Sequence, residues 1–361
     1  MAPEMPDRAL VIGASGQVGR AVCDRLAGDG WAVTAVQRRL VDLGKTIRTC
    51  ACDRDSSQFD DILAEGFDVV VDMRAFGEGH AVQLIRHAND IGSVILLSSA
   101  AVYRGENGRT IEDGLTTDEW PRYPTLISED DPVVAPDDTT YAGQKRAVEE
   151  ALLQSVLPTT VLRAAAIHGP HSSQPREWFY IKRLLDGRRR FVLGYDGKAG
   201  LHPVAADNLA EMARLAARRP GDRILNAGDP GAPVERDTGA AIAAAMGMAV
   251  DIRVTSGTPP IASPYSLPSA CLLSLDAAVD SLGYAPVASH REAIAGTCRW
   301  ILAEHAAGRF KGRLSSRFGP PGLGVQVFGG FGHDPFDYQA EDRLWEELEG
   351  PDGPVIDKRR A

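Results

Sequence analysis

A tyrosine and a lysine four residues apart are the residues of this sequence best suited to moving a proton. Tyr141 and Lys145 occupy the run YAGQK at the start of a predicted helix. Residues four apart share one helix face, so the phenol and the ammonium point into the same cleft. A free phenol has a pKa of about 10, and a neighbouring cation favours the phenolate and lowers that pKa. We therefore predict a general acid–base pair; the alternative is two side chains on a solvated helix face.

A pair of serines stands where a third catalytic group is expected. Ser98 and Ser99 follow the apolar run Val94–Leu97, which predicts a buried strand. Ligands of parallel α/β sheets bind at the carboxyl ends of the strands. A serine hydroxyl at this edge can donate a hydrogen bond to a substrate oxygen while Tyr141 exchanges the proton.

A glycine-rich turn lies between the first predicted strand, Ala9–Gly13, and a predicted helix, Gln17–Ala27. Its G-x-x-G-x-x-G spacing permits a tight turn, a close approach of a pyrophosphate and close helix–strand packing. The free N–H groups at the helix N-terminus favour bound phosphate. The alternative is a turn that merely packs closely. The predicted dinucleotide-binding residues of this loop are Gly13, Ser15, Gly16, Gln17, Val18 and Gly19.

Two arginines after the second predicted strand favour NADP over NAD. Proteins that bind NAD typically carry Asp or Glu there, which accepts a hydrogen bond from the ribose 2′-hydroxyl. Arg38 and Arg39 instead supply guanidinium groups that can bind a 2′-phosphate through charge-assisted hydrogen bonds. The alternative is that both arginines lie in solvent and that NAD is bound.

Residues after the third and fourth predicted strands extend the expected cofactor site. Asp53 lies where the adenine edge is expected, and Arg54 is beside it. The segment Asp72–Arg74, which contains Met73 and ends in Arg74, is expected to line the cofactor cleft because it follows a strand at the same edge.

Strands alternate with helices through the first half of the chain. Such alternation indicates right-handed βαβ units and a parallel sheet. The predicted fold class is therefore α/β: a Rossmann-type doubly wound parallel sheet with a smaller C-terminal substrate-binding domain. The predicted strands are Ala9–Gly13, Ala32–Val36, Ile47–Ala51, Val69–Val71, Val94–Leu97 and Thr159–Arg163. Later helices are predicted at Trp178–Leu185, Asn208–Ala217, Ala240–Met246, His290–His305 and Asp342–Leu348.

These patterns divide the chain into three parts. Residues 1–168 form the predicted dinucleotide-binding domain, to which a segment near 200–226 returns, and residues 169–307 form mainly the substrate domain. Residues 308–361 are a Gly/Pro-rich extension that we expect to wrap the body or contact a partner. No period is visible between Tyr103 and Thr139; we interpret this stretch as a substrate lid, with solvated decoration as the alternative.

Charge and composition exclude several function classes. The 361 residues carry a formal net charge of −10, which disfavours a surface that follows nucleic-acid phosphates. The five cysteines lack the paired spacing of a zinc site, so we expect no metal and a reducing compartment. No run approaches the roughly 18 apolar residues of a membrane span, and we expect a cytoplasmic protein that contacts neither membrane nor nucleic acid.

The motifs together resemble the extended short-chain dehydrogenase/reductase family, which includes the NAD-dependent epimerase/dehydratases. The resemblance covers roughly residues 8–305 and rests on GASGQVG, LLSSAAVY, YAGQK, LRAAAIHGP and LHPVAADNLA. It implies that Ser99, rather than Ser98, is the catalytic hydroxyl, that Tyr141 is the acid/base and that Lys145 is its partner. The family's lysine also bonds the nicotinamide ribose, so Tyr141 and Lys145 count among the expected cofactor contacts.

Further contacts follow from the same resemblance. Ala164–His168 matches the segment that passes the nicotinamide, which makes Ala166 and His168 expected cofactor residues, with Ser98 beside them. The resemblance also implies a homodimer packed through the helices that begin near Gly79 and Tyr141. The expected substrate contacts are Ser99, Ala100, His168, His171 and Trp178, with a hydrogen-bonded loop histidine and core packing as the alternatives for the histidines and the tryptophan.

Two departures from family patterns narrow the expected reaction. Sugar-nucleotide 4,6-dehydratases carry an Asp-Glu pair where this chain has Ala100 and Ala101, which disfavours dehydration. Epimerases that retain NAD usually keep an acidic residue where Arg38 and Arg39 stand. We therefore predict NADPH-dependent reduction of a carbonyl of a small polar metabolite, or the reverse oxidation. The alternatives are a nucleotide-sugar epimerase with retained cofactor and, in another class, a non-catalytic dinucleotide sensor or RNA-associated scaffold.

Overall fold

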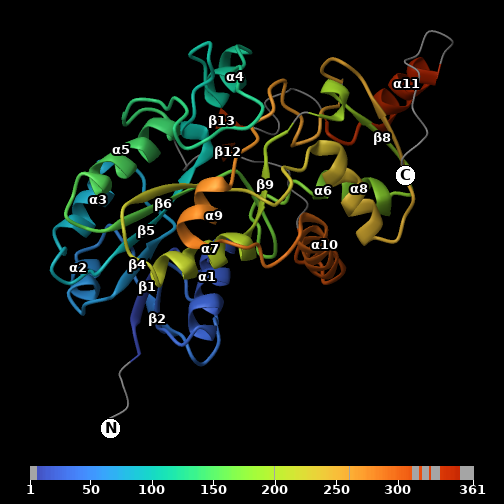
Figure 1. Cartoon of the computed structure of the whole chain (residues 1–361). Coiled ribbons are helices and arrows are strands. Elements are labelled where there is room, and N and C mark those ends of the chain that lie inside the picture. The colour runs from blue at the N-terminus through green and yellow to red at the C-terminus, as the bar shows by residue number, and fades with distance from the viewer. Residues whose placement is uncertain are drawn as a thin grey trace.

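A seven-stranded parallel sheet forms the centre of the molecule (Figure 1). The computed structural model describes residues 6–198, 200–259, 261–310 and 334–349, and two short strands at 317–318 and 325–326. The strand order β10-β6-β5-β4-β1-β2-β3 is that of a Rossmann fold, so the predicted fold class is confirmed. The strands are β1 (Arg8–Ile12), β2 (Ala32–Gln37), β3 (Arg48–Ala51), β4 (Val69–Asp72), β5 (Val94–Ser99), β6 (Thr159–Ala164) and β10 (Arg223–Ala227).

Helices cover both faces of the sheet because its strands are apolar on both sides. In β1, Ala9 and Val11 enter one core cluster, and Leu10 and Ile12 enter the cluster on the opposite face. The first face carries α1 (Gln17–Gly28), α7 (Ala206–Ala217) and α9 (Asp276–Leu282); the second carries α2 (Gln58–Leu63), α3 (Glu78–Ile85) and α5 (Tyr141–Leu153). The long-range return of β10 and α7 places residues 206–227 in this nucleotide half.

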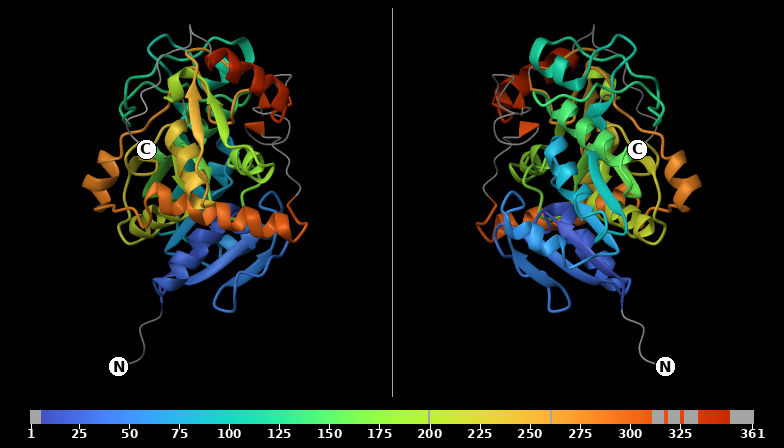
Figure 2. Two further views of the ribbon diagram at one scale, coloured as in Figure 1. Left: turned by 90° about the vertical axis from the view of Figure 1, so that its right-hand side faces the viewer. Right: turned by 90° about the vertical axis from the view of Figure 1, so that its left-hand side faces the viewer.

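A second apolar core lies beyond the carboxyl edge of the sheet and belongs to the smaller domain. Two parallel strand pairs frame it, and α10 lies across the boundary between the two cores in Figure 2. Its strands are β7 (Ala166–His168), β8 (Arg190–Leu193), β9 (Pro203–Ala205) and β11 (Asp251–Val254). Its helices are α6 (Trp178–Leu185), η2 (Tyr195–Gly197), α8 (Glu235–Ala245) and α10 (His290–Ala306). The helix predicted from Ala240 thus begins at Glu235, because Asp237 caps the backbone N–H of Val234.

The stretch between Tyr103 and Thr139, predicted to lack regular structure, contains the helix α4 (Ile111–Thr117). Thr110 and Asp113 form a capping box at its start, in which each side chain accepts a hydrogen bond from the other residue's backbone N–H. This T-x-x-D spacing is a helix-start signal that the sequence offered, but one short helix gives too few turns for a visible apolar period.

Part of the predicted C-terminal extension packs on the smaller domain. The helix α11 (Tyr338–Glu349) places Glu341 3.1 Å from Arg183, and both side chains are buried. Trp345 is also buried, and the guanidinium of Arg253 lies 3.9 Å from its ring centroid. The short strands β12 (Arg317–Phe318) and β13 (Val325–Gln326) pair antiparallel, and β13 contacts α4. Residues 311–316, 319–324, 327–333 and 350–361 of the extension lie outside the described residues.

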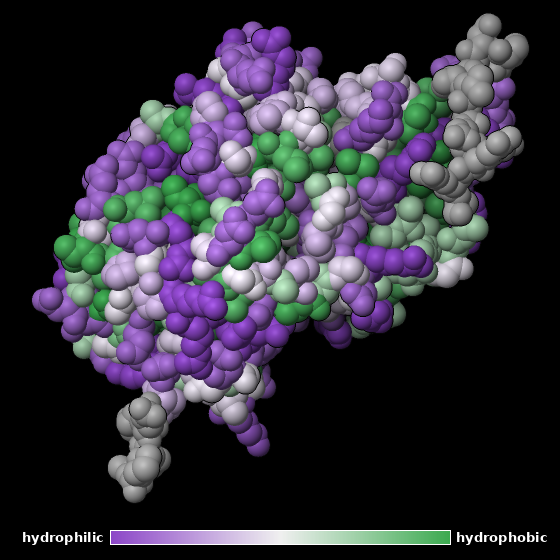
Figure 3. Space-filling view, viewed as in Figure 1, coloured by the Kyte–Doolittle hydropathy of each residue, from purple (hydrophilic) through white to green (hydrophobic). Residues whose placement is uncertain are grey.

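Polar and apolar residues are interspersed over the face of the molecule drawn in Figure 3. Among the described residues, no helix combines the length and the apolar character needed to cross a bilayer.

Candidate active site

The glycine-rich loop joins β1 to α1 in the geometry that a bound dinucleotide requires. Gly13 has φ +84°, and a Cβ on Gly19 would lie 2.4 Å from the Gly13 carbonyl oxygen, so neither position accepts a side chain without distortion. Gly16 begins α1 without a side-chain cap, which leaves the N–H groups of the first turn available to a phosphate. The buried Nε2 of Gln17 has no hydrogen-bond partner, which also fits a group bound at this loop.

Arginine side chains gather beside this loop. Arg38 and Arg39 follow β2 and are exposed. The side chain of Arg74 lies over Gly13, where a Cβ would meet its Cγ at 2.5 Å. Burial lowers the pKa of Arg74, and the positive charge of Arg38 adds to that shift. The segments that follow β2 and β4 thus both carry arginines, and guanidinium groups are suited to binding a 2′-phosphate.

Arg54, which was predicted to contact the cofactor, binds protein groups in the structure. Its guanidinium is buried, with Nη1 2.7 Å from Asp72 Oδ2 and Nη2 3.2 Å from Gln83 Oε1. Asp72 also accepts a hydrogen bond from the Arg74 backbone N–H at 2.8 Å. Arg54 therefore supports the cofactor edge through Asp72, because its two terminal nitrogens, Nη1 and Nη2, already have protein partners. Asp53 is exposed beside it, and its adenine contact stays a prediction.

Ser99 and Tyr141 meet at the carboxyl edge of the sheet, as predicted from their positions. Ser99 ends β5, and its Oγ accepts a hydrogen bond from Ala101 N at 3.1 Å, at the start of the short helix η1 (Ala100–Val102). Tyr141 is the first residue of α5 and is hydrogen-bonded to the Ser99 side chain. The two groups can therefore contact one substrate oxygen together.

The pKa of the Tyr141 phenol is raised, whereas the sequence analysis expected it to be lowered. Burial raises the pKa of Tyr141, the hydrogen bond to Ser99 opposes that rise, and the charge of Glu112 adds to it. The Lys145 ammonium is buried and donates to Ala75 O at 3.0 Å and Leu97 O at 2.9 Å. The phenol is thus protonated at neutral pH, which suits a proton donor.

Lys145 itself is fixed between the ends of β4 and β5. Its Nζ lies 4.3 Å from the ring centroid of Phe76, a residue whose ring centroid is 6.0 Å from that of Tyr141. Burial lowers the pKa of Lys145 to about 8, and the charge of Asp72 opposes the shift. The lysine is mostly protonated at neutral pH and is held at the edge where a nicotinamide ribose is expected; that contact stays a prediction.

Glu149 is a site residue that the sequence analysis missed. It is fully buried, accepts a hydrogen bond from Ser98 Oγ, and binds Arg163 of β6, whose Nη2 lies 2.9 Å from Oε2. Tyr141, Lys145 and Glu149 are spaced by four residues, so one face of α5 contacts the end of β5, the strand that carries both Ser98 and Ser99. The sequence pattern that could have revealed Glu149 is the continuation of Y-x-x-x-K to Y-x-x-x-K-x-x-x-E. The Ser98 hydroxyl is engaged by Glu149, and its cofactor contact stays a prediction.

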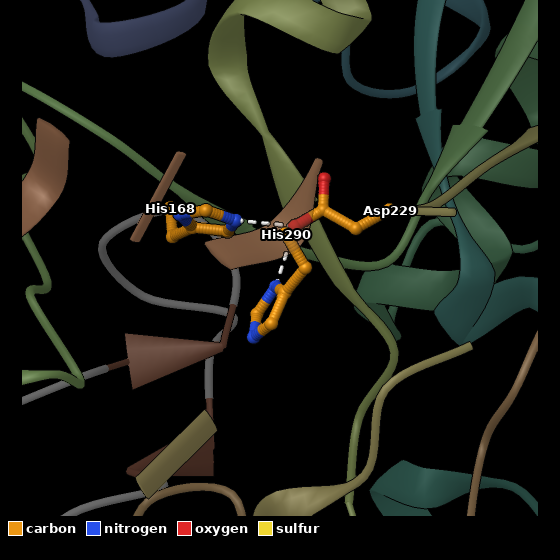
Figure 4. A group of neighbouring side chains, drawn as sticks. All are labelled: His168, Asp229 and His290. Carbon is orange, nitrogen blue, oxygen red and sulfur yellow. Dashed lines mark hydrogen bonds and ion pairs between the residues drawn. The ribbon is translucent and has the colours of Figure 1, made fainter. Parts of the chain in front are cut away.

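The His168 side chain does not face the substrate cleft, contrary to its prediction. It is fully buried, with Nε2 2.6 Å from Asp229 Oδ2 and Nδ1 3.2 Å from Thr297 Oγ1 (Figure 4). His290 Nδ1 lies 2.8 Å from the same Asp229 oxygen. The alternative of a hydrogen-bonded histidine is therefore correct, and the cluster joins β7 to the start of α10. No sequence spacing marks this cluster, because its members come from three distant segments.

Proximity alone would make His168, Asp229 and His290 a candidate metal site. The nitrogen–oxygen separations of 2.6 and 2.8 Å are hydrogen-bond lengths, whereas two ligands of one tetrahedral zinc ion lie about 3.3 Å apart. Asp229 holds the pKa of His168 above its ordinary value against the effect of burial, and the pKa of Asp229 is itself well below its usual range. The cluster is thus a buried hydrogen-bonded network centred on the Asp229 carboxylate.

Trp178 also departs from its prediction as a substrate contact. It is buried, and its ring centroid lies 4.7 Å from that of Phe310 and 5.1 Å from that of His305, so it packs in the core of the smaller domain. His171 is exposed and lines a hollow of about 430 Å³ together with Ser15 of the glycine loop. His171 therefore stays a candidate. The buried Ala100 and Ala166 offer only apolar contact, and their predicted roles are untested.

Comparison with known proteins identifies the family. A model described as the NAD dependent epimerase/dehydratase family matches residues 9–228, more than half of the chain. A dTDP-4-dehydrorhamnose reductase from Streptomyces griseus is 29% identical over 231 residues, which are 60% of this chain and 67% of that protein.

Solved structures share the fold. A UDP-glucuronic acid 4-epimerase from Bacillus cereus, solved with UDP-glucuronic acid and NAD, has a TM-score of 0.62 at 16% identity and covers 82% of this chain and 99% of its own. A UDP-N-acetylglucosamine 4-epimerase from Methanobrevibacter ruminantium, solved with UDP-N-acetylmuramic acid, has a TM-score of 0.64 at 18% identity and covers 83% of this chain and 100% of its own.

Proposed function

This chain belongs to the NAD dependent epimerase/dehydratase family, and from that premise we propose that it is an NADP-dependent oxidoreductase that reduces a carbonyl group. The observation that carries the proposal is the position of Tyr141, whose phenol is hydrogen-bonded to Ser99 at the carboxyl edge of the sheet. Reduction of a carbonyl needs a proton donor beside the substrate oxygen, and a half-buried phenol with a raised pKa is one at neutral pH.

Different residues of the chain would bind the cofactor and transfer the proton. The glycine loop and the open N-terminus of α1 would hold the cofactor phosphates, and Arg38, Arg39 and Arg74 would hold a 2′-phosphate. The bound cofactor would supply the hydride. Tyr141 donates its proton to the substrate oxygen, Ser99 hydrogen-bonds the same oxygen, and Lys145 supplies a positive charge at the ends of β4 and β5, on the same helix as Tyr141.

We propose a nucleotide-linked keto sugar as the first substrate class to test, because the relative from Streptomyces griseus is a dTDP-4-dehydrorhamnose reductase. Incubation with NADPH and a dTDP-4-keto-6-deoxy sugar is expected to oxidise one NADPH for each hydroxyl formed. Loss of nicotinamide absorbance measures the first quantity, and chromatography of the sugar measures the second.

Epimerisation is the second candidate, and the solved epimerase structures favour it. An epimerase would interconvert UDP-sugars without net oxidation of NADPH and would retain cofactor through purification. If the protein interconverts UDP-sugars and reduces no keto sugar in the same assay, the reductase proposal is wrong and epimerisation takes its place. A non-catalytic sensor would do neither. The homodimer through α3 and α5, which pack side by side, stays a proposal, as does a cytoplasmic location.

The choice of NADP has its own test. Arg38→Ala is expected to weaken NADPH binding about 10- to 100-fold, since a charge-assisted hydrogen bond to phosphate contributes about 1.5 to 3 kcal/mol. NADH binding should change little, because NADH lacks the 2′-phosphate. Titration of each nucleotide by protein fluorescence measures both affinities.

The matched control for this titration is Arg86→Ala. Arg86 is an exposed arginine at the end of α3 in the same domain, and its replacement should leave both affinities unchanged. Equal affinities of the wild-type protein for NADPH and NADH would contradict the choice of NADP while leaving the reductase proposal in place.

A further inference from the structure

The N-terminus of the catalytic helix α5 is capped from another segment of the chain. An α-helix leaves its first backbone N–H groups without intrahelical partners. In α5, Thr140 Oγ1 accepts a hydrogen bond from Gly143 N at 2.9 Å, the usual local cap. The N–H groups of Tyr141 and Ala142 instead donate to the carboxylate of Glu112, at 3.2 and 2.9 Å.

Packing fixes the position of Glu112. It is the second residue of α4, and its neighbour Ile111 is buried. The ring of Trp120 packs against Gly114, where a Cβ would approach the ring within 2.5 Å, and the indole N–H donates to Asp118 at 2.7 Å. These contacts keep α4 folded. The Glu112 carboxylate that caps α5 is therefore held in place by a helix.

Glu112 also contributes charge at the phenol. The groups that surround Tyr141 are the Ser99 hydroxyl from β5, the Phe76 ring from the segment after β4, and Glu112 from α4. Two cations belong to the same surroundings: Lys145 on α5 is bound to two backbone carbonyls, and the Arg74 guanidinium lies 5.9 Å from the ring centroid of Phe76.

Among these groups, Glu112 is the one whose charge raises the pKa of the phenol. The carboxylate of Asp137, at the same helix end, bonds Thr139 and Thr140 and contributes no such shift.

We propose that Glu112 is a positioning residue for Tyr141, which caps α5 from the inserted segment 103–139 and places a negative charge beside the phenol. The catalytic consequence of this inference rests on the proposed function. The charge of Glu112 keeps Tyr141 in the protonated form, which can donate a proton to a substrate carbonyl. It also gives the inserted segment a role at the reacting group, in addition to any role in covering substrate.

The test compares the ionisation of the Tyr141 phenol with and without the charge. Glu112→Gln removes the charge and keeps one oxygen, which can accept one of the two N–H bonds, while the amide NH2 replaces the second acceptor. The ultraviolet absorbance of phenolate is titrated in the wild type and in Glu112→Gln, and the same titration of each protein with Tyr141→Phe added is subtracted to isolate Tyr141. The midpoint is expected to move to lower pH by about half a pH unit or more in Glu112→Gln, because a repelling negative charge favours the neutral phenol.

Asp137→Asn is the matched control, since it removes a carboxylate from the same helix end and should leave the Tyr141 midpoint in place. An unchanged midpoint in Glu112→Gln, or an equal change in Asp137→Asn, would overturn the proposal. The titration needs no substrate, so it stands even if the reductase proposal fails. With a substrate in hand, the decline of kcat at high pH should move in parallel with the midpoint, which a purely structural cap would not produce.

Discussion

Replacing Tyr141 with phenylalanine is expected to lower kcat for carbonyl reduction about 100- to 10,000-fold, the usual contribution of a positioned general acid. The phenylalanine ring keeps the contact with Phe76, whose ring centroid lies 6.0 Å away, while the proton donor is lost. Affinity for NADPH should stay within about twofold, because the glycine loop and the arginines that we expect to bind it are untouched. Single-turnover oxidation of NADPH measures the chemical step directly.

Tyr338→Phe is the control for this experiment. It removes a phenol oxygen that bonds Asp186 on the far side of the smaller domain, and full activity is expected. Full activity of Tyr141→Phe would show that another group donates the proton and would remove the central assignment of the site. Ser99→Ala in the same series should also reduce kcat, and the double variant should lose less than the product of the two effects, because both groups serve one oxygen.

Replacing Glu149 with alanine is expected to destabilise the fold by about 3 to 5 kcal/mol, the typical cost of removing one partner of a buried ion pair. Arg163 would keep its charge in the core, with Nε and Nη2 left without their carboxylate partner, and Ser98 would lose its acceptor. Urea unfolding followed by circular dichroism measures the change in the free energy of unfolding.

Glu150→Ala provides the comparison on the next residue of the same helix. Glu150 is half-buried and pairs with Arg146 at 3.4 Å, so its loss should cost less than about 1 kcal/mol. Similar losses in the two variants would mean that Glu149 contributes only helix propensity. Glu149→Gln keeps the volume of the side chain. Its folded fraction should still be less active than the wild type, since Glu149 holds the end of β5, which carries Ser99, against Tyr141.

The nucleotide half of the molecule could be predicted from the sequence because its determinants are local. Apolar runs of β1, β4 and β5 are buried on both faces, and their alternation with helices fixes parallel pairing and the edge at which ligands bind. The spacing of Gly13, Gly16 and Gly19 encodes the turn itself. Tyr141 and Lys145 lie on one helix, so their common direction follows from the helical period alone.

Tertiary structure decided which groups each side chain meets and in which protonation state. Arg54 and His168 lie where the sequence places cofactor residues, yet Asp72 and Asp229 engage them inside the protein. His168 and Asp229 are 61 positions apart, and no local period links such distant partners. Glu112 lies 29 positions before Tyr141 and reaches it only because α4 folds against α5. The pKa of Tyr141 depends on burial and on this long-range charge, and neither quantity is defined until the chain has folded.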